Sequence, residues 1–436
     1  MLKSTIAILL LLFLFGCNND LNSIYTSSSP TNSSNNPSGS NLLVNSPTTD
    51  SSIPMLAILL SYNNIQISSN ETTWAEKLYG ENQSQLNHYF LQNSTNKFKF
   101  TPAKENSGIT DNGVALVKLN KNHPDTNIDN SNFSQNVYPD FTAALKSLNN
   151  TVDFSNFDKD ANGVITSNEL LLVFIVAGYE DSYENRHVVN GIWAHQNCMI
   201  KSENIPILDS VSLLSCKNKG RFLTIGELHD KSFSHDATIG IIAHELGHLA
   251  FGLPDLYNTK SPQLGGIGYL GLMGSGTWGQ KSLYDLPGNT PTHLSAWSKS
   301  FIGWSTPLET NGTVALYETA SNRYNIIKIP INETSYYLLE NRNNSGYDRG
   351  LFSLSGDFNG GIAIWKIDNT RLTEKYFSTN SVNSDVFNSA VVLIKAIPGS
   401  QDKEESLFYE SNTNSFSNIV KDISQRGSIM SFTIKN

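Results

Sequence analysis

The hydrophobic positions of the chain repeat with two different periods, and each period predicts a type of element. Apolar residues at every third or fourth position predict helices over residues 74–92, 138–148, 239–251 and 291–299. Continuous or alternating apolar runs predict strands over residues 53–61, 98–100, 170–177, 313–317, 324–329, 336–340, 361–367, 391–396 and 428–434. Helices and strands are therefore mixed up to about residue 304, and the remainder of the chain is β-rich.

The helix predicted at residues 239–251 has two different faces. At about 100° per residue, its apolar side chains fall on one stripe, formed by Ile239, Ile242, Ala243, Leu246 and Ala250. His244 and His248 lie four positions apart on the opposite side, so both imidazoles can reach one metal ion. Gly252 and Pro254 then end the helix. We therefore expect one face to pack into a core and the histidine face to look into a cleft.

Residues 244–248 read His-Glu-x-x-His, a pattern typical of zinc peptidases. Glu245 is poorly placed to bind a metal held by the two histidines, but it is well placed to accept a proton from the attacking water. The alternative is a buried helix that carries these residues by chance. Further along, Met273 lies in a glycine-rich turn, and metzincin peptidases place such a methionine beneath their metal. For Met273 the alternative is an ordinary core residue.

Residues 158–169 read Asp-Lys-Asp-Ala-Asn-Gly-Val-Ile-Thr-Ser-Asn-Glu and match the calcium-binding loop of an EF-hand. The ligands predicted by this match are Asp158, Asp160, Asn162, Val164, Thr166 and Glu169. The alternative is an acidic surface turn without a metal. Because residues 170–177 are rich in β-branched and aromatic side chains, we expect a single calcium loop that leads into a strand.

The N-terminus has the features of an export signal. An apolar run at residues 6–15 is too short to span a bilayer, which takes about 20 residues, and it ends in Leu-Phe-Gly-Cys. This predicts a bacterial lipoprotein signal peptide over residues 1–17, with lipid attached to Cys17; a plain secretory signal or a single anchor helix is the alternative. Residues 18–52 are mostly Ser, Asn, Thr and Pro, and we expect them to form a disordered tether between the membrane and a folded domain at residues 53–436.

The composition is that of an ordinary globular protein, with 39% hydrophobic and 16% charged residues. The formal net charge is −9 without any basic block, which argues against nucleic acid as a partner. With Cys17 assigned to lipid, Cys198 and Cys216 remain, and in an oxidising compartment two cysteines most simply form a disulfide. Zinc binding by these thiols is not expected, because neither has a second cysteine nearby.

Beyond the histidine helix, several segments in order resemble the immune inhibitor A family of secreted bacterial metallopeptidases. These segments lie at residues 174–180, 192–195, 253–257, 293–299, 303–304, 336–342 and 360–368. The resemblance implies an α+β, metzincin-like zincin fold, in which a mixed sheet and an active-site helix are followed by a β-rich portion from about residue 305. It also implies a zinc-dependent endopeptidase that acts on proteins or peptides.

The resemblance further implies Asp255 as the third zinc ligand, with one departure from the family pattern. Phe251 adds a residue between His248 and Gly252, so Asp255 follows His248 by seven positions rather than six. A slightly longer helix, or a wide turn before Gly252, would absorb this residue. Asp285, a later carboxylate, is the rival for the same role.

The expected reaction needs a second group that stabilises the scissile carbonyl oxygen, and Tyr257 and His293 are the candidates. His195 and His293 are each expected to be structural rather than catalytic. A catalytically silent lipoprotein of the same fold, which binds proteins or surface ligands, is the other functional hypothesis. The presence of Glu245 argues against it, because a pure binding protein needs no general base.

Overall fold

The computed structural model describes residues 51–126, 136–184, 188–261, 266–356, 358–397, 407–411 and 415–435. The predicted signal peptide, Cys17 and nearly all of the predicted tether lie outside these residues. Within the described ranges, no helix is long and apolar enough to cross a membrane.

The first half of the chain is built around an eight-stranded mixed sheet with β10-β9-β4-β1-β2 as its main order; β3, β5 and β6 pair with β1, β4 and β9. β6 and β10 run antiparallel to β9, and the other pairs are parallel. The bounds are β1 Ser52–Ser61, β2 Lys99–Pro102, β3 Val114–Lys118, β4 Leu171–Glu180, β5 Gly191–Ile192, β6 His195–Asn197, β9 Phe222–His229 and β10 His235–Asp236.

Side chains of the central strands alternate between two hydrophobic cores, because successive residues of a strand point to opposite faces. In β1, Met55 and Leu59 enter one core, whereas Ile58 enters the other. The first core also receives α1 (Glu71–Tyr79), α2 (Leu86–Asn93) and α6 (Ile239–Phe251). α4 (Tyr138–Leu148) covers the opposite face, where Phe141 stacks on Phe174 of β4 at 4.1 Å between ring centroids. The sheet is therefore buried on both faces.

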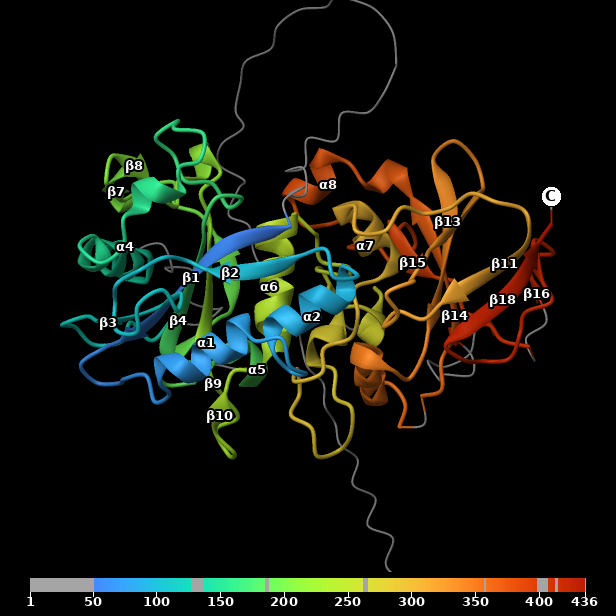
Figure 1. Cartoon of the computed structure of the whole chain (residues 1–436), viewed down its shortest axis with the longest axis horizontal. Helices are drawn as coiled ribbons and strands as arrows, with labels where there is room; N and C mark the ends of the chain where they lie inside the picture. The colour runs from blue at the N-terminus through green and yellow to red at the C-terminus, as the bar shows by residue number, and fades with distance from the viewer. Residues whose placement is uncertain are drawn as a thin grey trace, which may run out of the picture.

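The second half contains two four-stranded antiparallel sheets, ordered β12-β13-β14-β15 and β11-β18-β17-β16, which lie on the right of Figure 1. The bounds are β11 Gly312–Tyr317, β12 Ile327–Pro330, β13 Ser335–Arg342, β14 Gly361–Asp368, β15 Val391–Leu393, β16 Ser415–Phe416, β17 Val420–Lys421 and β18 Ile429–Ile434. Leu339 and Ile364 face the core between these sheets, whereas Leu338 and Trp365 belong to the same core as α6. α6 thus packs against both halves of the molecule (Figure 1).

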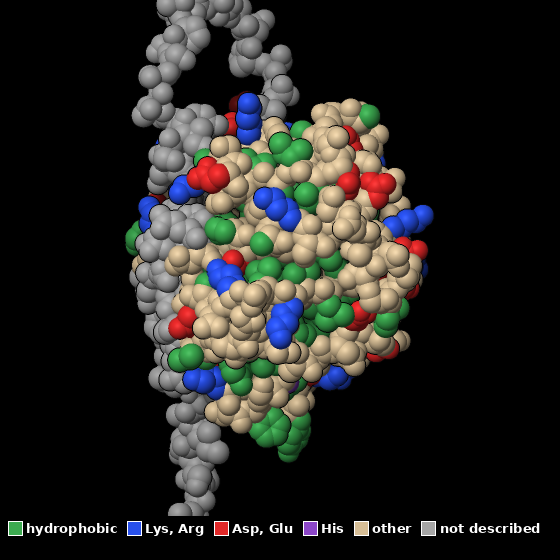
Figure 2. All heavy atoms as spheres, turned by 90° about the vertical axis from the view of Figure 1, so that its left-hand side faces the viewer, with side chains coloured by type: hydrophobic (Ala, Val, Ile, Leu, Met, Phe, Trp, Pro, Cys, Tyr) green, Lys and Arg blue, Asp and Glu red, His purple; other side chains and the backbone are tan. Residues whose placement is uncertain are grey.

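Short elements complete the fold. They are α5 Asp181–Glu184, α7 Ala296–Ile302, α8 Glu374–Ser378, and the hairpin of β7 Ile207–Leu208 and β8 Val211–Ser212. 3-10 helices lie at Phe154–Phe157, Ser202–Asn204, Cys216–Asn218, Gly268–Leu270, Ser275–Trp278, Gly346–Ser353 and Asn369–Arg371. On the face of the molecule that carries α4 and β3, basic and acidic side chains are interspersed (Figure 2).

The α+β class with a mixed sheet and a β-rich second half is confirmed. Two helix predictions were wrong in their bounds. The helix predicted over residues 74–92 is two helices, because Gly80 ends α1 in an extended conformation (φ −69°, ψ 154°) and α2 begins only at Leu86. The helix predicted over residues 291–299 begins only at Ala296, where the Ser295 hydroxyl accepts a hydrogen bond from the Ser298 N–H.

Candidate metal centre and active site

α6 carries the His-Glu-x-x-His residues and is buried along its whole length. His244 and His248 lie one turn apart, with 4.8 Å between their ring centroids. The histidine face was expected to look into a cleft, yet His244 and His248 are only 3% and 7% exposed. The chain from Leu253 to Leu256 and the turn around Met273 hydrogen-bond to this part of the helix and account for its burial.

Backbone carbonyls orient both imidazole rings. His244 Nδ1 lies 3.0 Å from the carbonyl oxygen of Leu272, and His248 Nδ1 lies 2.6 Å from that of Leu253. A carbonyl oxygen can only accept, so we assign the ring proton to Nδ1 in each case. The Nε2 atoms then carry lone pairs, which is the form in which a histidine binds a metal.

Asp255 completes a cluster with the two histidines. Its Oδ1 lies 3.0 Å from His244 Nε2 and 3.3 Å from His248 Nε2, and its side chain is fully buried. α6 continues through Phe251, and Gly252 ends it with φ of 64°. The additional residue in this connection is therefore accommodated in the last turn of the helix, and the chain still returns Asp255 to the histidines.

The electrostatics of the cluster favour a cation. Burial alone would raise the pKa of Asp255, but His248 and His244 hold it well below its usual value, so the carboxylate stays ionised. Burial likewise lowers the pKa of His248, but the charge of Asp255 outweighs this and raises the pKa to about 9. In the absence of a metal, the carboxylate therefore attracts a proton to a position where a metal ion would bind.

The residues present fit a metal ion. His248 Nε2 and Asp255 Oδ1 are buried, and although close together they form no hydrogen bond of acceptable geometry. The three candidate ligand atoms all lie within 4.8 Å of one another. Two imidazole nitrogens and one carboxylate oxygen are ligands that zinc prefers, and three protein ligands leave a fourth position open. Glu245, 2% exposed, adjoins His244 on the same helix.

Met273 packs directly against α6. A Cβ added at Gly247 would lie 2.7 Å from Met273 Sδ and 3.3 Å from its Cε, so the absence of a side chain at Gly247 lets the thioether pack directly on the helix. The carbonyl of Met273 accepts a hydrogen bond from the Leu256 N–H at 2.8 Å, next to Asp255. Because Leu272 also binds His244, this turn contacts the helix, one histidine and the Asp255 loop at the same time.

The other carboxylate and histidines considered from the sequence lie in separate environments. Asp285 accepts hydrogen bonds from Thr290, Asn289 and the Lys281 N–H, and it is not part of the cluster around Asp255. His293 is fully buried, with Nδ1 3.1 Å from Asn93 Oδ1. Tyr257, the other candidate stabiliser, is 4% exposed and lies directly after the Asp255 loop.

The predicted calcium loop brings three carboxylates together. Oxygens of Asp158, Asp160 and Glu169 lie within 4.8 Å of one another. Asp158 accepts hydrogen bonds from the Asn162 and Gly163 N–H groups at 3.0 and 2.8 Å, with Gly163 at φ of 78°. β4 begins at Leu171, directly after the loop, so the segment leads into a strand rather than a helix.

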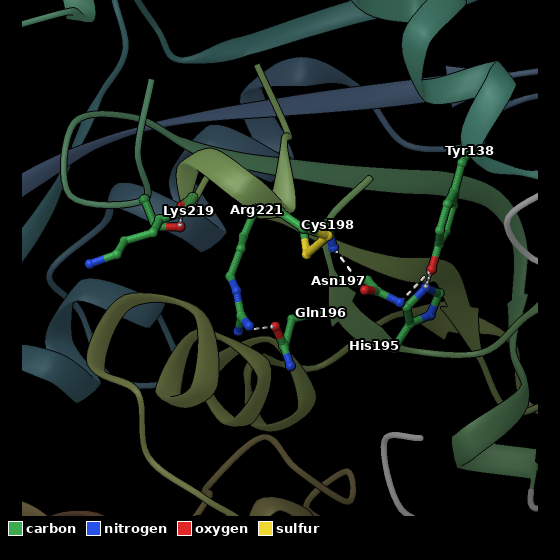
Figure 3. The surroundings of a disulfide bond; sticks show 9 residues. Tyr138, His195, Gln196, Asn197, Cys198, Lys219 and Arg221 are labelled. Carbon is green, nitrogen blue, oxygen red and sulfur yellow. Dashed lines mark hydrogen bonds between the residues drawn. A yellow bond between two sulfur atoms is a disulfide. The ribbon is translucent and has the colours of Figure 1, made fainter. Parts of the chain in front are cut away.

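Cys198 and Cys216 form a disulfide with an S–S distance of 2.05 Å (Figure 3). It lies at the end of β6, where Asn197 donates a hydrogen bond to the Tyr138 hydroxyl at 2.7 Å. His195 points toward the same hydroxyl, with Nε2 at 3.3 Å, and its Nδ1 lies 2.8 Å from the Trp193 carbonyl oxygen. His195 is therefore engaged in the packing around the disulfide.

Two residues near the candidate metal centre had no role predicted from the sequence. Asn380 hydrogen-bonds to both the main chain and the carboxylate of Asp255. Arg342 donates to the Leu270 carbonyl at 2.6 Å, close to the Met273 turn, and pairs with Asp348. Arg342 lies in one of the family-like segments, whereas nothing in the local sequence distinguishes Asn380 from other asparagines of the second half.

The site combines two histidines and a buried carboxylate around one point. A glutamate lies beside one histidine on the same helix, which packs on a mixed sheet. These features define the class of metal-dependent peptidases. The particular family follows from comparison with known sequences. The model of the family described as immune inhibitor A peptidase M6, catalytic domain, matches residues 61–306. This is more than half of the 436 residues, and the chain belongs to that family. A comparison with curated proteins finds no match.

Proposed function

We propose that this metallopeptidase is a zinc-dependent endopeptidase that hydrolyses peptide bonds in proteins or peptides. The observation that carries the proposal is the convergence of His244 Nε2, His248 Nε2 and Asp255 Oδ1 within 4.8 Å of one another. Of these atoms, His248 Nε2 and Asp255 Oδ1 are buried and have no hydrogen-bond partner among the described residues. A zinc ion held by these atoms would lower the pKa of a water molecule and polarise the scissile carbonyl.

The side chains of the site have distinct tasks in this reaction. The carbonyls of Leu272 and Leu253 keep the Nε2 atoms of the histidines available as ligands. Glu245 accepts a proton from the attacking water on its carboxylate and delivers it to the leaving amine. Burial of the site excludes bulk water and strengthens these electrostatic interactions.

Replacement of Glu245 by glutamine tests the proposal. We expect Glu245→Gln to retain zinc and to lose about 10²–10⁴-fold in kcat on an unfolded protein substrate, because the ligands remain while the general base is removed. Glu203→Gln, an exposed position, is the matched control and should behave like wild type. Zinc content and proteolysis are measured on the same samples. A Glu245→Gln variant as active as wild type would contradict the mechanism.

The alternative is a catalytically silent lipoprotein that binds proteins or surface ligands with the same fold. Glu245 argues against this alternative, because it is buried beside His244 on α6 and a pure binding protein needs no general base. A wild-type protein with one bound zinc but no proteolysis of several unfolded substrates would favour this alternative.

We further propose that residues 158–169 bind calcium and that the ion stabilises the fold rather than taking part in the reaction. The arrangement of Asp158, Asp160 and Glu169 supports this. The remaining predicted ligands are Asn162, Val164 and Thr166. A ligand that binds only the native state raises the melting temperature. We expect millimolar calcium to raise it in a chelated sample with zinc restored, and to have no such effect on Asp158→Asn; equal melting of wild type with and without calcium would refute the site.

We also propose that lipid on Cys17 anchors the protein to the cell membrane or outer membrane, with the domain facing outward or into the periplasm. The support is the Leu-Phe-Gly-Cys sequence after the apolar run, and residues 18–52 would serve as the tether. Native protein should fractionate with membranes, and Cys17→Ser should release it or leave its signal uncleaved. Wild-type protein that is soluble and begins downstream of Cys17 would disprove the anchor.

A further inference from the structure

Asn380 makes two hydrogen bonds to Asp255, one to the main chain and one to the carboxylate. Its Oδ1 accepts from the Asp255 N–H at 2.8 Å, and its Nδ2 donates to Asp255 Oδ2. The orientation of the amide is fixed, because the N–H can only donate and the ionised carboxylate can only accept. A side chain that donates and accepts at this spacing is an amide, so neither a hydroxyl nor a carboxylate can replace it fully.

The position of Asn380 is itself well defined. It follows α8, its N–H donates to the Phe377 carbonyl at 3.0 Å, and its own carbonyl accepts from the Thr259 hydroxyl at 3.1 Å. Its φ of 46° lies in the left-handed region, which asparagine tolerates better than most residues. The neighbouring Asn383 donates to the Leu256 carbonyl at 2.9 Å. The turn after α8 is therefore bonded to the Asp255 loop at several points.

These contacts determine which oxygen of Asp255 faces the histidines. The torsion that rotates a carboxylate has broad, nearly equivalent minima, so an unrestrained carboxylate samples several orientations. With Oδ2 bonded to Asn380, Oδ1 remains 3.0 and 3.3 Å from the two Nε2 atoms. Hydrogen bonds of this kind orient a metal ligand, and their loss typically weakens metal affinity by about 10–100-fold.

We propose that Asn380 is a positioning residue for the third metal ligand. It lies beyond residue 306, where the match to the family ends, so the β-rich half of the chain contributes directly to the metal centre. This inference rests on the proposed function, in which His244, His248 and Asp255 bind zinc. Asn380 acts through Asp255, and no step of the reaction is assigned to it.

Two substitutions test the role of the amide without changing the backbone conformation. Asn380→Asp is nearly isosteric and keeps an acceptor for the Asp255 N–H, but it places a carboxylate against Oδ2. Asn380→Gly allows the same positive φ and removes both contacts. We expect the zinc dissociation constant, measured in competition with a chromophoric chelator, to rise by about 10–100-fold in both variants. At saturating zinc, kcat should recover substantially and KM should not change.

Asn383→Ala is the matched control, because it removes contacts with Leu256 and Val391 but none with the Asp255 carboxylate. It should lower the melting temperature while the folded protein keeps nearly wild-type zinc affinity. Folded Asn380→Asp and Asn380→Gly proteins that bind zinc within about twofold of wild type would overturn the inference, since an oriented ligand is worth more than that. A wild-type protein that binds no zinc would instead refute the proposed function.

Discussion

Gly247 is the residue of α6 against which the Met273 side chain packs. Met273 is fully buried, so its side chain has little space into which it can move away from a new methyl group. In an unhindered helix, alanine is more stable than glycine by about 1 kcal/mol. At this position the helix preference and the packing restraint therefore oppose each other.

We predict that Gly247→Ala destabilises the wild-type protein by about 1–3 kcal/mol, because overpacking outweighs the gain in helix propensity. In a Met273→Ala background the obstacle is absent, and the same substitution should become neutral or stabilising by up to about 1 kcal/mol. Denaturant unfolding of the four proteins of this double-mutant cycle provides the measurement. Equal effects in both backgrounds would show that the contact with Met273 does not restrain the helix.

At this scale, the predictability of the site depends on distance along the chain. His244, Glu245 and His248 belong to one helix, so their spacing alone placed them on it. Asp255 required the resemblance to a family as well, since the turn at Gly252 determines where it returns. Asn380 could not be predicted, because its role exists only once a turn after α8 packs on the Asp255 loop.

α7 docks on the β-rich half through a buried charged cluster. The Ala296 N–H at its start donates to Glu340 Oε1 at 3.2 Å, and the same carboxylate accepts from Tyr324 and Trp365. Lys299 is fully buried, with Nζ 4.1 Å from the centroid of the Tyr324 ring and no hydrogen-bond partner among the described residues. Burial lowers the pKa of Lys299 from 10.5 to about 8, although Glu340 partly opposes this change.

This pKa predicts a pH dependence of stability. Between about pH 8 and 9.5 the unfolded chain keeps its proton on Lys299 while the folded protein loses it, so unfolding becomes less favourable as the pH rises. Lys77, with a pKa lowered to about 8, adds to the same trend. His248, whose pKa is raised to about 9, opposes the trend, so the comparison is with wild type at each pH. We therefore expect the free energy of unfolding, measured with urea, to increase less over this interval in Lys299→Met than in wild type. Lys328→Met, at a partly exposed position, is the control and should keep the pH dependence of wild type.

The elements themselves were predicted with uneven success, for identifiable reasons. Strands such as β1, β4 and β14 have long buried runs, and the alternation of their side chains between two cores gave a strong pattern. The first part of the helix predicted before and through α7, residues 291–295, is absent, because tertiary contacts rather than a helix bury these residues. One such contact is the hydrogen bond from the Tyr89 hydroxyl to the Thr292 carbonyl at 2.8 Å.

At the scale of the whole molecule, the disulfide supports the calcium-loop region from a distance in sequence. The loop between Cys198 and Cys216 contains Ser212, whose N–H donates to the Gly163 carbonyl at 2.9 Å and whose carbonyl accepts from the Ile165 N–H at 3.0 Å. The predicted calcium loop is thus paired with a segment whose ends the disulfide joins.

We predict that the double variant Cys198→Ser, Cys216→Ser is less stable by about 3 kcal/mol, the loop-closure entropy expected for a cross-link of this span. Melting in the presence and absence of a reductant provides the measurement, and the double variant itself should be indifferent to the reductant. If wild-type melting is also unaffected by complete reduction, the disulfide does not contribute to stability.

The bond between Asp255 and Asn380 joins residues 125 positions apart. A ribosome releases the two histidines and Asp255 long before it releases their partner, and closure of so long a loop is slow and entropically costly. If Asn380 positions the ligand as proposed, a nascent or truncated chain would hold zinc only weakly. The timing of synthesis would then act as a safeguard, since proteolytic competence would arise only in a molecule whose second half has been made and folded.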